Sequence, residues 1–211
     1  MNSIIVKDGY GIIAGFLVIA IAVSFFFHPI WGILPFGLAL FMMFFFRNPK
    51  RQIKYDDKLL LSPADGTVMG VTEFYDEEYL DAPAIKVTIF LSVFDVHVNR
   101  TPMKGEIKYQ RYTCGGFRPA YKSTASFENE RHAIGLENEH MKVLVIQIAG
   151  ILARRIVSWV TLGRNLEQGQ LYGMIKFGSS TELVMPKNVE VLVKKGDKVK
   201  GGITVIGRME N

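Results

Sequence analysis

A glycine–serine pair near the C-terminal end has the residue types and the setting for chemistry on the chain itself. Gly178 and Ser179 lie between two apolar runs, 171–175 and 183–186, which are typical of strands. Glycine and serine alone are typical of turns, so the pair gains meaning only from the residues that accompany it.

Three side chains earlier in the sequence are candidates to act with Ser179. Asp65 lies in a Ser-Pro-Ala-Asp-Gly segment, and Asp95 and His97 share a Phe-Asp-Val-His-Val-Asn-Arg segment. A hydroxyl, an imidazole and carboxylates are the components of an activated nucleophile. The sequence therefore predicts a reactive Ser179 that these groups support.

Three kinds of chemistry can be considered for this set of residues. A Ser-His-Asp hydrolase would carry its serine in a Gly-x-Ser-x-Gly turn, but Phe177 and Thr181 occupy the glycine positions. A membrane-bound Ser-Lys protease would use Lys176 or another lysine as its base. In self-processing, Ser179 attacks the Gly178 carbonyl, an N-to-O acyl shift gives an ester, and β-elimination splits the chain. The new N-terminus then carries a pyruvoyl group made from Ser179, an electrophile and electron sink in the role of a cofactor.

Four short segments with polar and potentially reactive residues occur in one order along the chain. They are SPADG at 62–66, FLSVFDVHVNRTP at 90–102, NER at 129–131 and KFGSST at 176–181. Together they resemble the phosphatidylserine decarboxylase family in its short form, over roughly residues 47–211. Arg-Asn-Pro at 47–49 is also similar to the Arg-Asp-Pro that follows the membrane hairpin of that family.

The resemblance assigns roles to the residues that match the family's motifs. It implies cleavage between Gly178 and Ser179, with Ser179 as the precursor of a covalent pyruvoyl group. Asp65 is expected to help orient the base during self-cleavage, and Asp95 and His97 match the family's Asp-x-His motif.

Arg100 marks a departure from the longer members of the family, which have a second histidine at this position. We therefore expect His97 to serve self-cleavage, decarboxylation or both. Arg100, Asn99 and Ser180 are expected to bind the substrate, Arg100 through a phosphate or carboxylate. We expect no metal, because no Cys/His spacing is typical of a zinc site.

The reaction that the resemblance implies converts phosphatidylserine to phosphatidylethanolamine. The lipid amine condenses with the pyruvoyl carbonyl as a Schiff base, and CO₂ leaves as electrons move into the conjugated system. His97 is expected to protonate the carbanion, after which hydrolysis releases the ethanolamine lipid. Diacyl and ether-linked serine lipids fit this chemistry equally well.

An apolar segment before residue 47 must hold this chemistry at a membrane. Residues 9–46 contain no Asp, Glu, Lys or Arg. The uncharged runs 10–27 and 30–46 each predict a helix of about 26 Å, slightly shorter than the ~30 Å hydrocarbon core. Pro29 and Pro35 disturb helix continuity, so two transmembrane helices and one re-entrant hairpin both remain open.

The charges after this hairpin predict its orientation. Four basic residues follow it closely, at positions 47, 50, 51 and 54. By the positive-inside tendency, this end lies on the cytoplasmic side, with the rest of the chain on the cytoplasmic face of the cell membrane. We therefore divide the chain into a membrane anchor, 1–50, and a decarboxylase domain, 51–211.

The second domain has the pattern of a mostly β structure, so the fold class is α+β with a barrel-like or sandwich-like catalytic domain. Segments 61–71 and 191–203 resemble hairpins of biotinyl and lipoyl domains. Segment 151–162 is compatible with helix or strand, and 76–81 and 115–130 have the composition of loops. Nine short β-like runs predict strands at 66–74, 84–92, 105–113, 132–137, 141–148, 172–177, 181–184, 189–193 and 203–208.

Composition limits the partners. The formal net charge is +5, but the aromatic residues gather in the apolar N-terminal segment instead of alternating with Lys and Arg. This pattern excludes nucleic-acid binding and favours an anionic membrane. The single cysteine, Cys114, excludes an internal disulfide. The expected partners are a serine phospholipid, the α and β chains of the cleaved protein, and a second copy in a homodimer.

Two alternatives to the decarboxylase remain open from the residues alone. One is the Ser-Lys protease, and the other is a non-enzymatic membrane adaptor or carrier built like a biotinyl or lipoyl domain. The chain has no lysine flanked by small residues or Met at a hairpin tip, which opposes a carrier.

Overall fold

The computed structural model describes residues 3–116, 128–150, 155–176 and 179–209. The chain divides into two compact units, residues 1–50 and residues 51–211, each of which we describe by itself.

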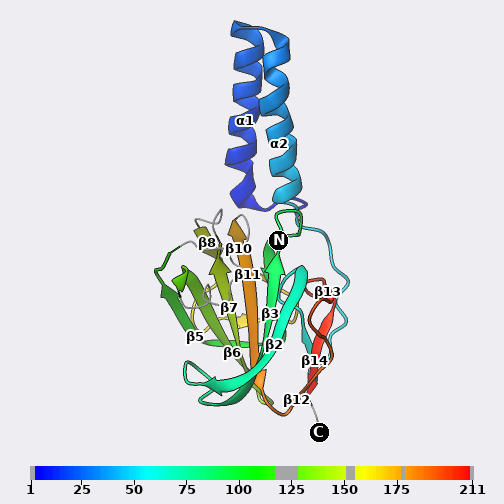
Figure 1. Cartoon of the computed structure of the whole chain (residues 1–211), viewed down its shortest axis with the longest axis vertical. Coiled ribbons are helices and arrows are strands. Elements are labelled where there is room, and N and C mark those ends of the chain that lie inside the picture. Colours follow the sequence, from blue (N-terminus) through cyan, green and yellow to red (C-terminus); the bar gives the residue numbers. More distant parts are fainter. Residues whose placement is uncertain (1–2, 117–127, 151–154, 177–178, 210–211) are drawn as a thin grey trace. The chain divides into compact units, whose positions relative to one another are not determined.

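The N-terminal unit is a helical hairpin (Figure 1). Helix α1 (Lys7–Phe26) is followed by a 3₁₀ turn, η1 (Pro29–Gly32), and by α2 (Ile33–Phe45). Pro29 is the first residue of η1, where proline's missing N–H costs no hydrogen bond. Of the described helices, only α1 is long and apolar enough to cross a membrane; α2 is shorter.

Two glycines let the antiparallel helices approach closely. A Cβ atom on Gly32 would collide with the Ser24 hydroxyl and would lie 2.9 Å from the Ala20 carbonyl oxygen. At the other end of the hairpin, a Cβ on Gly9 would lie 2.6 Å from the Phe46 Cβ. Small residues at such crossings are typical of helix pairs in lipid, where close van der Waals packing replaces the hydrophobic effect.

The described residues of the second unit form three antiparallel sheets. The largest has eight strands in the order β13-β2-β3-β11-β7-β6-β5-β9, and the others have the orders β4-β10-β8 and β1-β14-β12. The strands are β1 (Leu59–Leu61), β2 (Gly66–Asp76), β3 (Ala82–Leu91), β4 (Val98–Arg100), β5 (Gly105–Thr113), β6 (Arg131–Glu137), β7 (Lys142–Ala149), β8 (Arg155–Ser158), β9 (Asn165–Leu166), β10 (Leu171–Lys176), β11 (Ser179–Pro186), β12 (Val189–Val191), β13 (Lys198–Val199) and β14 (Val205–Met209).

The eight-stranded sheet curls around the main core, as Figure 1 shows, with β11 between β3 and β7. Its buried residues include Ile89, Val145 and Leu183 from the large sheet, with Leu60 and Tyr172 from the two small sheets. The expected α+β class with a mostly β, barrel-like domain is therefore confirmed.

The structure agrees with most of the expected strands and differs in informative places. The strand expected at 181–184 starts earlier, at Ser179, and segment 151–162 contains strand β8 in its described part. The loop expected at 76–81 begins with a buried residue, Asp76, whose carboxylate accepts hydrogen bonds from two backbone N–H groups of the following turn. Most of the expected loop 115–130 lies outside the described residues. Four strands of two or three residues, β1, β4, β9 and β13, were not predicted because they are too short for a pattern.

The Gly32 crossing generates a test of the hairpin. Gly32→Leu should separate the helices, because the side chain has no room beside Ser24 and Ala20. Gly37→Leu is the matched control, since its added Cβ meets nothing within 4 Å. We place spin labels at Val18 and Leu38, with Cys114 replaced, and measure their separation by double electron–electron resonance. We expect a longer mean distance and a broader distance distribution only for Gly32→Leu. Equal distances in the two variants would contradict the packing described here.

Candidate active site

Ser179 is the first residue of β11 and lies in the middle of the large sheet. It pairs with Leu91 of β3 on one side and with Ala149 of β7 on the other. Its side chain is fully buried, and its Oγ has no hydrogen-bond partner among the described residues. A buried hydroxyl without a partner carries a desolvation cost, which is typical of a functional group held for chemistry. Its neighbours Phe177 and Gly178 lie outside the described residues.

The first four residues of β11 are polar and buried, and they alternate between the two faces of the sheet. Ser179 and Thr181 share the face that continues into the main core at Leu183. Ser180 and Glu182 lie on the other face, where the Glu182 carboxylate is 3.4 Å from the Lys86 amine. The predicted substrate-binding residue Ser180 thus points away from the face of Ser179.

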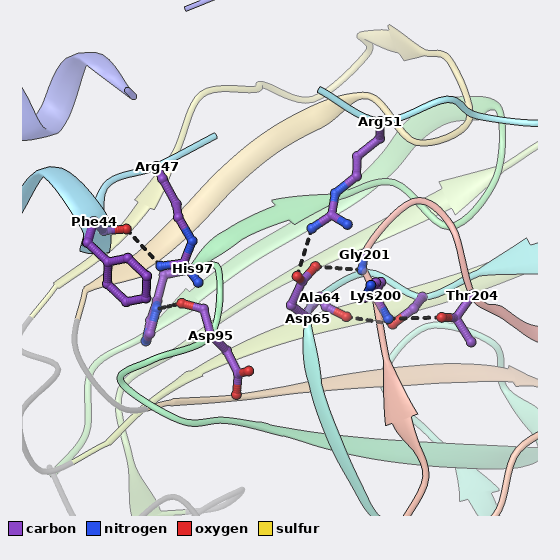
Figure 2. A network of polar contacts seen from close by, with 11 residues as sticks. Phe44, Arg47, Arg51, Ala64, Asp65, Asp95, His97, Lys200, Gly201 and Thr204 are labelled. Carbon is purple, nitrogen blue, oxygen red and sulfur yellow. Dashed lines mark hydrogen bonds and ion pairs between the residues drawn. The ribbon is translucent and has the colours of Figure 1, made fainter. Parts of the chain in front are cut away.

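His97 is fully buried just before β4. Its Nδ1 lies 2.9 Å from the backbone carbonyl oxygen of Asp95, as Figure 2 shows. A carbonyl oxygen only accepts, so Nδ1 carries the proton and, in the neutral ring, Nε2 keeps its lone pair. This tautomer suits a base that acts through Nε2. The His97 carbonyl accepts a hydrogen bond from the Ile175 N–H, which attaches it to β10 near the residues that precede Ser179.

Asp95 supports His97 through its backbone. Its carboxylate accepts a hydrogen bond of 2.8 Å from the Ser92 N–H, and its own N–H donates to the Ser92 carbonyl. The side chain therefore closes the turn that presents the Asp95 carbonyl to the imidazole. The Asp95 carboxylate thus bonds to the backbone of this turn, whereas the aspartate of a hydrolase triad bonds to the imidazole through its carboxylate.

Asp65 holds together segments that are distant in sequence. Its carboxylate accepts from the Arg51 guanidinium at 2.7 Å and from the Gly201 backbone N–H at 2.7 Å, as Figure 2 shows. The two side chains of the ion pair are largely buried, with 10% and 15% of their surface exposed. Asp65 thus ties the start of the second unit to its C-terminal segment.

Arg100 lies near Asp65 and Arg51, on the face of β4 opposite to Asn99. Its guanidinium donates to the Gly169 carbonyl oxygen at 3.0 Å. Burial, and secondly the charge of Arg51, lower the pKa of Arg100, while Asp65 opposes this shift. Alternation along β4 places Arg100 and Asn99 on opposite faces of the strand.

Asn99 begins a buried chain of hydrogen bonds that sequence reasoning did not find. The Asn99 amide nitrogen donates to the Thr181 hydroxyl at 3.0 Å, and its oxygen accepts from Gln147 at 2.8 Å. Gln147 then contacts His132 at 3.1 Å, and His132 contacts Gln110 at 3.0 Å. Desolvation lowers the pKa of His132, an effect that its hydrogen bond to Gln147 partly offsets.

Asn129 supports the other neighbour of Ser179. Its amide donates to the Ala149 carbonyl oxygen at 2.6 Å, and the Ala149 N–H donates to the Glu130 carbonyl at 2.9 Å. The Asn-Glu-Arg segment thus fixes the end of β7 that pairs with Ser179.

One signal for Gln147 was present in the sequence, since it is the single polar residue between 143 and 149 in an otherwise apolar strand.

Comparisons with known proteins agree on one family. The family model for phosphatidylserine decarboxylase matches residues 38–207. A phosphatidylserine decarboxylase proenzyme of Carboxydothermus hydrogenoformans is 57% identical over 180 residues, which cover 85% of this chain and 84% of that protein. Proenzymes of the same name from Symbiobacterium thermophilum and Syntrophus aciditrophicus are 45% and 41% identical, and each alignment covers at least 97% of both chains.

The buried His132 generates a prediction of pH dependence. Because the pKa of His132 is lowered in the folded state, the unfolded chain binds more protons as the pH falls below about 6.5, and folding stability decreases there. We expect urea denaturation of the full chain in detergent, kept in one piece by Ser179→Ala, to show a smaller loss of stability between pH 7.5 and 5.0 when His132→Gln is added. His140→Gln in the same background, at an exposed histidine, is the control and should leave the pH dependence unchanged. Parallel curves with and without His132→Gln would show the prediction to be wrong.

Proposed function

Because the chain belongs to the phosphatidylserine decarboxylase family, we propose that it is a self-processing, pyruvoyl-dependent enzyme that converts phosphatidylserine to phosphatidylethanolamine and CO₂. One observation carries the proposal. The serine of the Lys-Phe-Gly-Ser-Ser-Thr segment is a fully buried residue at the start of a central strand, and its hydroxyl lacks a hydrogen-bond partner among the described residues.

The first reaction is on the chain itself. The Ser179 Oγ forms a bond to the Gly178 carbonyl carbon while the C–N bond breaks, and the hydroxyl proton leaves to a base as the nitrogen gains one. Elimination then removes the proton from the Ser179 Cα and breaks the Cβ–O bond, which frees the Gly178 carboxylate. Addition of water and loss of ammonia leave the pyruvoyl group at the new N-terminus.

His97 is the proposed base, and its support fits this role. The Asp95 carbonyl fixes its tautomer, so that Nε2 carries the lone pair. Burial keeps water from the ring, which strengthens its interactions with nearby charge. Asp65 would support the site indirectly, because its two carboxylate oxygens accept hydrogen bonds from Arg51 and from the Gly201 N–H.

Ser179 fits the precursor of the pyruvoyl group, because its side chain is buried and polar and has no hydrogen-bond partner in the part of the chain that the structure describes. The group would supply the carbonyl that condenses with the lipid amine as a Schiff base and takes up electrons when CO₂ leaves. His97 would then return a proton to the substrate carbon. Substrate binding by Asn99, Arg100 and Ser180 stays a prediction; the structure gives Asn99 and Arg100 internal hydrogen bonds as well.

The membrane is the proposed location of this reaction. Helix α1 has 20 residues and a length of about 30 Å, enough to cross the hydrocarbon core. The basic residues that follow the hairpin favour the cytoplasmic leaflet, where anionic lipids attract them. We propose that the decarboxylase unit lies on this face, and that the protein forms a homodimer.

The alternatives have less support. Lys176, the base of a Ser-Lys protease, lies on β10 in the sheet β4-β10-β8, whereas Ser179 starts β11 in the large sheet. For the adaptor, the residues from 194 to 197 do form a solvent-exposed turn like that of a biotinyl or lipoyl hairpin. The similarity to decarboxylase proenzymes extends over nearly the whole chain and favours the enzyme.

Self-cleavage is the direct test of the proposal. We expect the purified wild type to give two chains, residues 1–178 and a chain of 33 residues that Edman sequencing cannot read. Ser179→Ala should give one intact, inactive chain, because no hydroxyl is left to attack. Ser158→Ala, another strand serine in the same unit, should cleave like the wild type. Intact mass and release of CO₂ from phosphatidylserine are the measurements, and an intact wild-type chain would refute the proposal.

The position of β11 predicts the fate of the small chain. After cleavage, β11 still pairs along its length with β3 and along its first six residues with β7, and β14 still lies between β1 and β12. We expect the 33-residue chain to co-migrate with the large chain in native mass spectrometry and to separate only on denaturation. Release of the small chain in native buffer would contradict this expectation.

A further inference from the structure

One end of the large sheet holds the proposed reaction, and a row of backbone pairs defines it. Ser179 pairs with Leu91, the last residue of β3, and with Ala149, the last residue of β7. In the next two strands, Arg131 at the start of β6 pairs with Thr113 at the end of β5. Five neighbouring strands, from β3 to β5, therefore have one end here, and a spacing of about 4.8 Å makes this end about 19 Å wide.

A phenylalanine is exposed at this end. Phe94 lies in the turn that follows β3 and is 66% exposed. Hydrogen bonds close the turn tightly: the Ser92 N–H donates to the Asp95 carboxylate, the Asp95 N–H donates to the Ser92 carbonyl, and the Phe94 N–H donates to the Ser92 hydroxyl. The exposure of the ring is therefore a fixed property of the turn, and an apolar ring gains free energy when it leaves water.

Two basic residues lie at the same end and face each other across a strand pair. Arg155, the first residue of β8, pairs with Lys176, the last residue of β10, and Ser179 follows Lys176 by three residues. Side chains of such a pair share one face, and like charges directly opposite each other destabilise a sheet. Anionic headgroups beside the pair would replace this repulsion by attraction.

A tyrosine adds an amphipathic side chain to this end. Tyr112, next to the last residue of β5, is 54% exposed. Desolvation is the main cause that raises the pKa of Tyr112 to about 12, and the charge of Arg155 opposes this shift. Tyrosine, with an apolar ring and a polar tip, is typical of membrane–water interfaces. We call Phe94, Tyr112, Arg155 and Lys176 the docking rim.

The opposite end of the same sheet has a different character. Glu106 of β5 pairs there with Glu137 of β6, and both line a pocket of about 580 Å³ together with Asp57 and Glu139. Lysines in the same pocket leave this end with mixed charge. At the rim end, Glu128 adds one exposed negative charge to the basic pair. Of the two ends, the rim therefore fits an anionic lipid surface better.

We propose that the docking rim binds an anionic lipid bilayer, with Phe94 inserted among the acyl chains and with Arg155 and Lys176 against the headgroups. A helical tether alone does not determine which surface of a domain meets the membrane, so a second contact has to do so. This docking rests on the proposed function, because a serine lipid in the bilayer must reach Ser179. The Asp95 carbonyl that supports His97 comes one residue after Phe94, so the lipid contact lies next to the proposed base.

The first test measures whether residue 94 enters the lipid. The full chain with Cys114→Ser and Phe94→Cys carries an environment-sensitive fluorophore at position 94, in nanodiscs of phosphatidylcholine and phosphatidylglycerol. We expect nitroxides on the acyl chains to quench this fluorophore about twofold or more, because inserted side chains reach the boundary of the acyl region. Leu162→Cys is the matched control and should not be quenched, since Leu162 is 61% exposed in a turn bonded to Ile107, near the opposite end.

The second test examines the basic pair. Nanodiscs of phosphatidylcholine alone should give less quenching at position 94 than nanodiscs with phosphatidylglycerol, because the anionic headgroups attract the rim. Arg155→Gln together with Lys176→Gln should abolish this difference. Arg164→Gln together with Lys104→Gln removes two charges near the opposite end and should leave the difference unchanged.

The third test connects the rim to the substrate. Phe94→Ser should lower CO₂ release from phosphatidylserine in nanodiscs about tenfold, and should leave release from a dispersed short-chain phosphatidylserine within about twofold. Phe94→Trp should keep both activities, because tryptophan also inserts at interfaces. Leu162→Ser is the control for loss of an exposed apolar side chain. Intact mass reports self-cleavage of every variant.

The outcomes separate the docking from the proposed function. Absence of lipid quenching at position 94 overturns the docking, as does a fluorophore that is shielded from water but not reached by the nitroxides, which would identify a second copy of the chain as the occupant. Equal losses of Phe94→Ser on both substrates also overturn it. A wild type that neither cleaves nor releases CO₂, with position 94 quenched by lipid, refutes the function and supports the docking.

Discussion

The burial of polar side chains in the central strand of the large sheet is the constraint on which the rest of the structure depends. Residues 179–182 of β11 are Ser, Ser, Thr and Glu, and all four are buried between β3 and β7. Each polar group taken from water needs a partner or carries a cost. Asn99 bonds to Thr181, and Lys86 and Thr88 bond to Glu182. The Ser179 hydroxyl has no such partner among the described residues, and it is the group that the proposed chemistry consumes.

The sequence allowed prediction of whatever depends on local pattern. The apolar hairpin, the mostly β second unit and nearly all of its longer strands follow from periodicity and charge, and the four motifs identified the family. Partners across the sheet do not follow from pattern. Nothing in the order of residues says that Gln147 on β7 meets Asn99 on β4, or that the Asp95 backbone, and not its carboxylate, faces His97.

Arg100 shows that a position in a sequence motif is weaker evidence for a residue's role than the face of the strand on which its side chain lies. It is three residues after His97, as the second histidine is in longer relatives, yet β4 turns it toward Asp65 and Gly169 while Asn99 faces Thr181. Because side chains alternate along β4, Asn99 contacts the polar residues of β11. Arg100, the next residue, lies instead near Asp65, which holds the C-terminal segment. The burial of both residues was not evident from their composition, because asparagine and arginine are usually exposed.

The location of Ser179 at the start of β11 has a consequence for the lifetime of the mature protein. Folding takes place on one covalent chain, in which two residues connect β10 to β11. Once the proposed cleavage cuts that link, a denatured enzyme must insert a separate peptide into the middle of a sheet, between strands that would otherwise collapse on each other or pair with other chains. Refolding then becomes bimolecular and competes with aggregation, so the cleaved enzyme owes its persistence to slow unfolding and not to reversible equilibrium. The proposed cleavage would therefore leave the mature protein less able to refold than the uncleaved chain.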